Sequence, residues 1–149
     1  MTPREAYFLA EKNGHTEELK HVVLSDVVWS FLYASNIHKD NDLFEKCLED
    51  SHMSLMWSRN IDKTPNDNAR KSACKDPEWA LMYALDVDGG PHEETRYGAS
   101  VDDYWAMLYA VLVDKCQHPV TKEMIVGSEY QEEYFKLGEI GSEEKEKEK

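Results

Sequence analysis

One stretch of the sequence occurs twice, and it constrains the fold more than any other feature. Residues 76–87 read Asp-Pro-Glu-Trp-Ala-Leu-Met-Tyr-Ala-Leu-Asp-Val, and residues 102–113 repeat the frame Asp-x-x-Trp-Ala-x-x-Tyr-Ala-x-x-Val. Weaker copies of this frame precede and follow the pair at steps of 24 or 26 residues. Repetition at a short, nearly constant period is typical of solenoids, in which each unit stacks on its neighbours. The six copies begin at Thr2, Asp26, Asp50, Asp76, Asp102 and Ser128.

Each copy begins with a residue type that favours the start of a helix. Thr, Asp and Ser carry a short side-chain oxygen that accepts a hydrogen bond from the first turn. Pro3 and Pro77 directly follow their caps, at a position where a helix does not need the backbone N–H. The third to eighth positions after the cap are mostly apolar or small, which predicts a buried helix of about three turns. In five of the six copies the seventh position is aromatic and is expected to fill the space between helices: Tyr33, Trp57, Tyr83, Tyr109 and Phe135.

A second, more polar helix is expected between each pair of buried helices. Turn signals such as Asn13-Gly14 and Gly89-Gly90-Pro91 separate the two kinds of segment. The second helices are predicted at 17–24, 42–49, 67–74, 93–100 and 120–126. Each shows one narrow apolar stripe at i and i+4, so a single hairpin cannot bury its own apolar face. The sequence therefore predicts an all-α, right-handed solenoid of about five and a half hairpins that forms a single domain over residues 1–138.

The two ends of the chain differ from its middle. The sixth frame has Glu132 and Lys136 where the fifth has alanines, as expected of a terminal repeat with a polar outer face. Residues 139–149 contain five Glu and three Lys, and we expect a charged, disordered tail there. The first residues do not have the pattern of a signal peptide.

The repeat resembles short α-helical tandem-repeat proteins, with units of about 25 residues, that occur in phages, large viruses and some bacteria. The likeness is carried by Leu32-Tyr33-Ala34-Ser35 through Asp40 and Phe44, and by the run Asp76–Ala80. It covers most of the chain from Thr2 to Gly138. The resemblance implies a stacked helical fold and suggests a small virus-encoded protein that acts on a host factor.

The net charge of the chain indicates which classes of partner are favoured and which are disfavoured. The formal net charge is -13 at pH 7, which disfavours direct binding to nucleic acid or to an anionic membrane. The same acidity favours association with a basic protein. The three cysteines cannot all pair with one another, and a reducing, cytoplasmic setting is the simplest interpretation, which means the host cytoplasm if the protein is viral.

The sequence contains no pattern that specifies catalysis, and we expect no enzyme activity and no cofactor. Gly-x-Ser-x-Gly, His-Glu-x-x-His and phosphate-binding glycine loops are absent. A structural metal site is not expected, because Cys47…His52 and Cys116-x-His118 lack a second half. The repeated tryptophans Trp29, Trp79 and Trp105 could form an aromatic ladder for a ligand, but the apolar neighbours in their frame favour a role in the core.

Two recurring charged sets are candidate sites. An acidic edge is predicted where the buried helices end, comprising Asp62, Asp86, Asp88, Glu93, Glu94 and Asp114. A basic row on the second helices comprises Lys20, Arg70, Arg96 and Lys122. The leading hypothesis is a non-enzymatic module that binds, and inhibits, a protein with a basic surface. Two alternatives stay open: a protein that binds a small anion or nucleotide through the basic row, and a nucleic-acid mimic that uses the acidic edge. Self-association through an imperfectly capped end is also possible.

Overall fold

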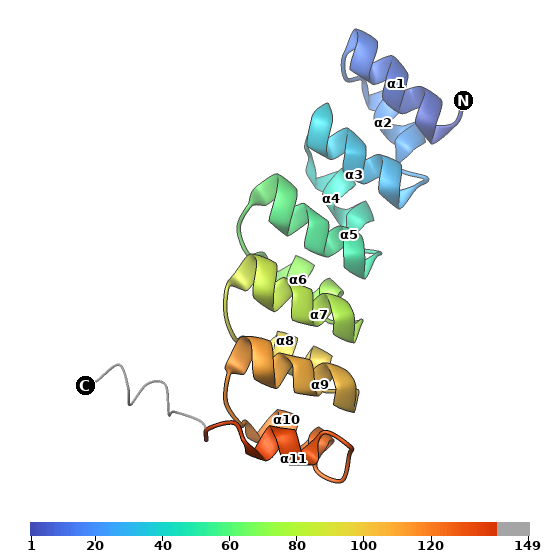
Figure 1. The fold of residues 1–149 in the computed structure, drawn as a ribbon. Coiled ribbons are helices and arrows are strands. Elements are labelled where there is room, and N and C mark those ends of the chain that lie inside the picture. The colour runs from blue at the N-terminus through green and yellow to red at the C-terminus, as the bar shows by residue number, and fades with distance from the viewer. Residues whose placement is uncertain (140–149) are drawn as a thin grey trace, which may run out of the picture. The chain divides into compact units, whose positions relative to one another are not determined.

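The computed structural model describes residues 1–139, which form short helices joined by short loops (Figure 1). No strand occurs within this described part of the chain, so the all-α prediction is confirmed for it. The predicted tail lies outside the described residues except for Glu139. The chain divides into two compact units, Met1–Ala73 and Cys74–Lys149. Of the helices described, none has the length and apolar character that crossing a membrane requires.

The first unit consists of successive helical hairpins. α1 packs against α2, α3 against α4, and α5 against α6, while α3 also contacts α1 and α5. α5 runs directly into a π-helical segment, η1, which ends at the left-handed residue Lys63. The bounds are α1 (Pro3–Asn13), α2 (Glu17–Val23), α3 (Val27–Asn36), α4 (Asn41–Cys47), α5 (Ser51–Met56), η1 (Trp57–Asp62) and α6 (Asp67–Ala73).

The second unit is built in the same way. α7 packs against α8 and α9 against α10, and α9 also contacts α7 and α8. α7 and α9 continue into π-helical segments that end at the left-handed residues Gly89 and Lys115. The bounds are α7 (Pro77–Tyr83), η2 (Ala84–Asp88), α8 (Glu93–Ala99), α9 (Asp103–Tyr109), η3 (Ala110–Asp114), α10 (Pro119–Ile125) and α11 (Gln131–Phe135).

The predicted caps form at five of the six frame starts. The side chains of Thr2, Asp26, Asp50, Asp76 and Asp102 each accept a hydrogen bond from the first turn of the following helix. The sixth prediction, Ser128, is wrong. Its hydroxyl donates to the Ile125 carbonyl at 2.6 Å and accepts from Tyr130 N–H at 3.2 Å, which makes a turn instead of a cap. α11 begins only at Gln131 and has no side-chain cap.

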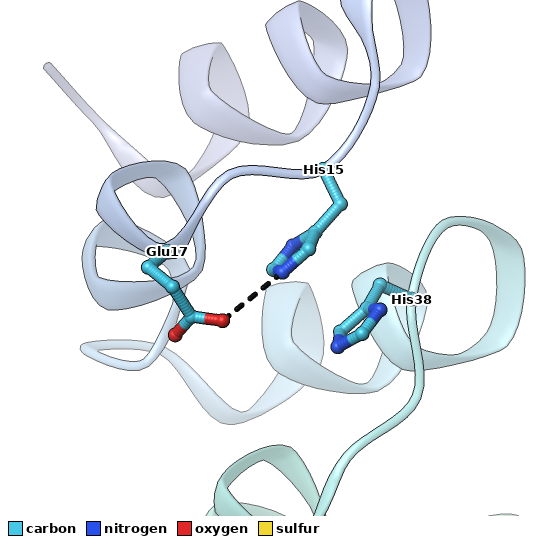
Figure 2. A group of neighbouring side chains, drawn as sticks. All are labelled: His15, Glu17 and His38. Carbon is cyan, nitrogen blue, oxygen red and sulfur yellow. Dashed lines mark hydrogen bonds and ion pairs between the residues drawn. The ribbon is translucent and has the colours of Figure 1, made fainter.

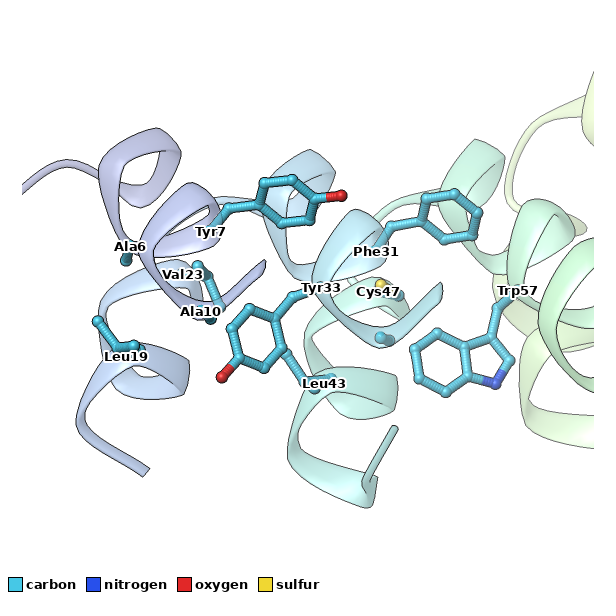
Figure 3. Packing of buried hydrophobic residues seen from close by; sticks show 11 residues of the cluster. Ala6, Tyr7, Ala10, Leu19, Val23, Phe31, Tyr33, Leu43, Cys47 and Trp57 are labelled. Atoms are coloured by element: carbon cyan, nitrogen blue, oxygen red, sulfur yellow. The ribbon is translucent and has the colours of Figure 1, made fainter. Parts of the chain in front are cut away.

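The small residues of the frame are buried, as their role in close helix packing requires. In the first unit, Ala6 and Ala10 of α1 pack beside Leu19 and Val23 of α2 in one cluster with Tyr33 (Figure 3). Ser30 and Ser54 replace alanine at this position and are fully buried. Their hydroxyls donate to the carbonyls of Val23 and Cys47, respectively, so the buried serine oxygens have partners.

The aromatic position shifts by one residue in the last helix, α11. Tyr134 is fully buried, whereas the predicted core residue Phe135 is 44% exposed. The reason is the hydroxyl group. Tyr134 Oη lies 2.9 Å from Thr121 Oγ1 and accepts from His118 N–H at 2.9 Å, and phenylalanine has no group that can do this. Tyr109 makes the same contacts with Thr95 and His92 one hairpin earlier.

Candidate functional site

Lys20, the first member of the basic row, forms ion pairs with three carboxylates of the same unit. Its side chain on α2 is 8% exposed, and Nζ lies 2.7 Å from Asp40 Oδ2, 2.9 Å from Asp42 Oδ2 and 2.8 Å from Glu17 Oε2. The hydrogen bond to Asp40, followed by those to Glu17 and Asp42, raises the pKa of Lys20. Lys20 therefore ties α2 to the start of α4 and remains charged.

Arg96 and Arg70 are also paired. Arg96 on α8 donates through Nε and Nη2 to both oxygens of Asp114 at the end of η3, at distances of 2.7–3.2 Å. This hydrogen bonding raises the pKa of Arg96. Arg70 is buried, and its Nη1 lies 2.7 Å from Asp67 Oδ1. Lys20 and Arg96 thus connect one hairpin to the next, whereas Arg70 pairs with Asp67 within α6.

Lys122 differs from the other three because it is exposed. Its ammonium lies 5.6 Å from the centre of the Phe135 ring. It lines an open hollow of about 490 Å³ together with Gln117, His118 and the carboxylate-bearing Glu123 and Glu139. Two carboxylates beside one ammonium do not form a setting that selects an anion.

Two members of the acidic edge, Asp62 and Asp114, bind cations of the fold. Asp62 accepts from Trp57 Nε1 at 3.1 Å and from Lys39 Nζ at 2.8 Å. The side chain of Asp114 is 2% exposed and forms an ion pair with Arg96. A member of the predicted acidic edge thus pairs with a member of the predicted basic row. On the second unit, Asp86 at η2 and Glu93 and Glu94 at the start of α8 are exposed, and Asp88 is half-buried.

The predicted tryptophan ladder contributes to packing. Trp29 packs against the core of the first unit, and Trp105 packs against the core of the second. Trp79 is half-buried. These positions agree with the interpretation as core residues, which the apolar frame favoured.

One group of side chains was not found by sequence reasoning. His15 lies in the loop between α1 and α2, Glu17 begins α2, and His38 lies in the loop between α3 and α4 (Figure 2). One ligand atom from each lies within 4.8 Å of the other two, which is a grouping that could hold a metal ion. No local spacing reveals it, because the two histidines belong to different hairpins and meet only when these pack.

Comparisons with known proteins do not place the chain in a family. A scan against protein-family models and searches of curated proteins and of solved structures gave no match.

Proposed function

We propose that this chain is a non-enzymatic protein–protein interaction module whose partner has a basic surface. The single observation that supports the proposal is that three cations of the basic row are paired within the fold, whereas many acidic side chains are exposed. Lys20, Arg70 and Arg96 are buried or half-buried in ion pairs, so they compensate carboxylates within the fold. The surplus of negative charge is therefore left on the surface, where it can speed association with a cationic partner.

The second unit illustrates this surplus over residues 74–139. Its exposed cations are Lys75, Lys115, Lys122 and Lys136. Its exposed acids are Glu78, Asp86, Glu93, Glu94, Asp102, Glu123, Glu129, Glu132, Glu133 and Glu139. Asp86, Glu93 and Glu94 belong to the acidic edge, and we take them as the centre of the interaction surface. The other two members are engaged within their own units, Asp62 by Lys39 and Asp114 by Arg96.

The way in which the hairpins stack as repeats is part of the same proposal. We infer that the hairpins form a right-handed solenoid with repeats that start at Thr2, Asp26, Asp50, Asp76 and Asp102. In the sixth repeat, predicted to start at Ser128, the buried aromatic residue is shifted by one position to Tyr134. Support comes from the contact that recurs within the second unit, where Tyr109 and Tyr134 each bind the start of the preceding polar helix. In the first unit Tyr33 makes a similar contact with His15 and Thr16. The resemblance to repeat proteins of phages extends the proposal to inhibition of a host protein.

The test is capture of a partner followed by measurement of its affinity. The full chain is used as bait in a bacterial lysate at moderate salt, and a captured stoichiometric protein is purified. Asp86→Asn/Glu93→Gln/Glu94→Gln is then compared with Glu18→Gln/Glu123→Gln/Glu129→Gln, which removes the same charge from scattered exposed sites. We expect the first variant to weaken binding at least tenfold more than the second. Equal affinities, or no stoichiometric partner, would contradict the proposal.

A further inference from the structure

The loops that follow α1 and α3 bring together two imidazoles and one carboxylate. The rings of His15 and His38 are stacked, with centroids 3.7 Å apart and planes inclined by 4°. Glu17 Oε1 lies 3.2 Å from His15 Nε2 (Figure 2). Both rings are half-buried, and all three residues lie in the Met1–Ala73 unit.

The neighbours of His15 allow its Nε2 atom to bind a ligand. His15 Nδ1 lies 2.7 Å from the Tyr33 hydroxyl, and that hydroxyl can donate its own proton to the Thr16 carbonyl at 3.5 Å. The Tyr33 oxygen is then free to accept the Nδ1 proton of His15. Metal-bound histidines usually donate their second ring N–H to such an oxygen, which fixes the ring and directs the other nitrogen at the metal. In this tautomer Nε2 and Glu17 Oε1 are two acceptors 3.2 Å apart, and a cation can lie between them; in the other tautomer Nε2–H donates to Glu17.

The charge around the group also favours a cation. Glu17, Asp40 and Asp42 surround the single ammonium of Lys20, so three carboxylates face one positive charge. Lys20 engages Oε2 of Glu17, which leaves Oε1 directed at His15. Asp40 Oδ2 also lies 3.4 Å from His38 Nε2, where it can orient that ring.

We propose that His15 Nε2, Glu17 Oε1 and a ring nitrogen of His38 bind one divalent transition-metal ion, with Zn²⁺ as the ion in the cell. Two imidazole nitrogens and one carboxylate oxygen suit Zn²⁺ and its neighbours Co²⁺ and Ni²⁺, whereas Mg²⁺ and Ca²⁺ prefer oxygen ligands alone. Metal–ligand bonds of about 2.0–2.2 Å require the ligand atoms to approach more closely than 4.8 Å. The lone pair of an imidazole nitrogen lies in the plane of its ring, so binding also requires His15 and His38 to turn out of their parallel stack. The bound ion joins the first hairpin to the second and stabilises this unit, independently of any protein partner.

The experiment is a titration of the metal-stripped full chain with Zn²⁺ by calorimetry and with Co²⁺ by visible absorption. We expect one ion per chain, a rise in melting temperature with Zn²⁺, and no effect of Mg²⁺ at the same concentration. His38→Ala and Glu17→Gln should each weaken Zn²⁺ binding at least tenfold. His21→Ala removes an exposed histidine of the same unit and should leave the affinity unchanged.

A second pair of variants tests the orientation of His15 without touching a ligand. Tyr33→Phe removes the hydroxyl beside His15, and we expect it to weaken Zn²⁺ binding by about 10–100-fold. Tyr7→Phe removes another tyrosine hydroxyl of this unit, which accepts from Asn36 instead, and should not change the affinity. Circular dichroism checks that each variant is folded. Lack of one-to-one binding, or equal weakening by His21→Ala and His38→Ala, would overturn the proposal.

Discussion

Arg96 and Asp114 form a bidentate ion pair that connects α8 to the end of η3 within the second unit. The guanidinium Nε lies 3.0 Å from Oδ2, and Nη2 lies 2.7 Å from Oδ1. The side chains are 14% and 2% exposed, respectively. The sequence assigned Arg96 to a basic row and Asp114 to an acidic edge, whereas in the fold each compensates the charge of the other.

Arg96→Ala should destabilise the second unit by about 3–5 kcal/mol, because it leaves the Asp114 carboxylate buried without its partner. Urea unfolding monitored by circular dichroism measures the change. Lys75→Ala, which removes an exposed cation of the same unit, should stay within about 0.5 kcal/mol of the parent chain. The double variant Arg96→Met/Asp114→Leu should recover most of the loss. A loss below about 1 kcal/mol for Arg96→Ala would show that the pair is not needed.

The last helix, α11, offers a direct test of the repeat register. Tyr134→Ala should cost about 3–5 kcal/mol because it removes a fully buried aromatic ring. Phe135→Ala removes a ring that is 44% exposed and should cost less than about 1 kcal/mol. Thermal unfolding of the two variants under one set of conditions compares them. If Phe135→Ala were the more damaging change, the frame would continue unshifted from Ser128.

The caps and the small core positions could be predicted because short-range rules decide them. An Asp before an apolar run caps a helix regardless of what packs on it, and Asp76 and Asp102 do so. The choice between Tyr134 and Phe135 could not be predicted in this way. It depends on the Thr121 hydroxyl and the His118 backbone, which reach the aromatic ring only after two hairpins have packed.

The contacts of the candidate site residues were harder to predict from the sequence, because they also form only when hairpins pack on one another. Recurrence located Arg96 and Asp114, but whether they face solvent or each other depends on the packing of one hairpin on the next. His15 and His38 occupy different positions in their loops, so no repeat signal relates them. Their meeting follows from the packing of α1 on α3 and from the contact of Tyr33 with the first hairpin.

Gly98 should not tolerate a side chain, although it lies inside α8, where alanine is intrinsically better by about 1 kcal/mol. A Cβ atom at Gly98 would lie 2.9 Å from both Ala80 Cβ and the Cys74 carbonyl oxygen. We expect Gly98→Ala to cost about 1–3 kcal/mol, because neither backbone nor a methyl group can move aside easily. Urea unfolding measures the change. Gly90→Ala is the control, since a Cβ there has no heavy atom within 4 Å. A stabilised Gly98→Ala variant would mean that α7 and α8 can separate slightly at little cost.

The stability of the second unit should fall in mild acid because of His118. Burial of this ring lowers its pKa below the ordinary value of 6.5, the charge of Arg96 lowers it further, and that of Asp114 acts in the opposite direction. Its Nδ1 also accepts from Val120 N–H at the start of α10 and must be unprotonated to do so. As the pH falls through about 6.5, His118 therefore binds a proton in the unfolded chain before it does so in the folded chain. The free energy of unfolding decreases as a result.

The measurement is the urea midpoint of the full chain between pH 8 and pH 5 for the parent and for His118→Asn. Asparagine is a strong N-cap and does not titrate, so it preserves the start of α10 while removing the proton linkage. We expect the two midpoints to run parallel above pH 7 and the parent to fall more steeply below about pH 6.5. His21→Asn changes an exposed histidine and should keep the parent's slope. A slope that His118→Asn leaves unchanged would assign the acid sensitivity to other groups, because proton binding at His118 would then be the same in the folded and unfolded chains.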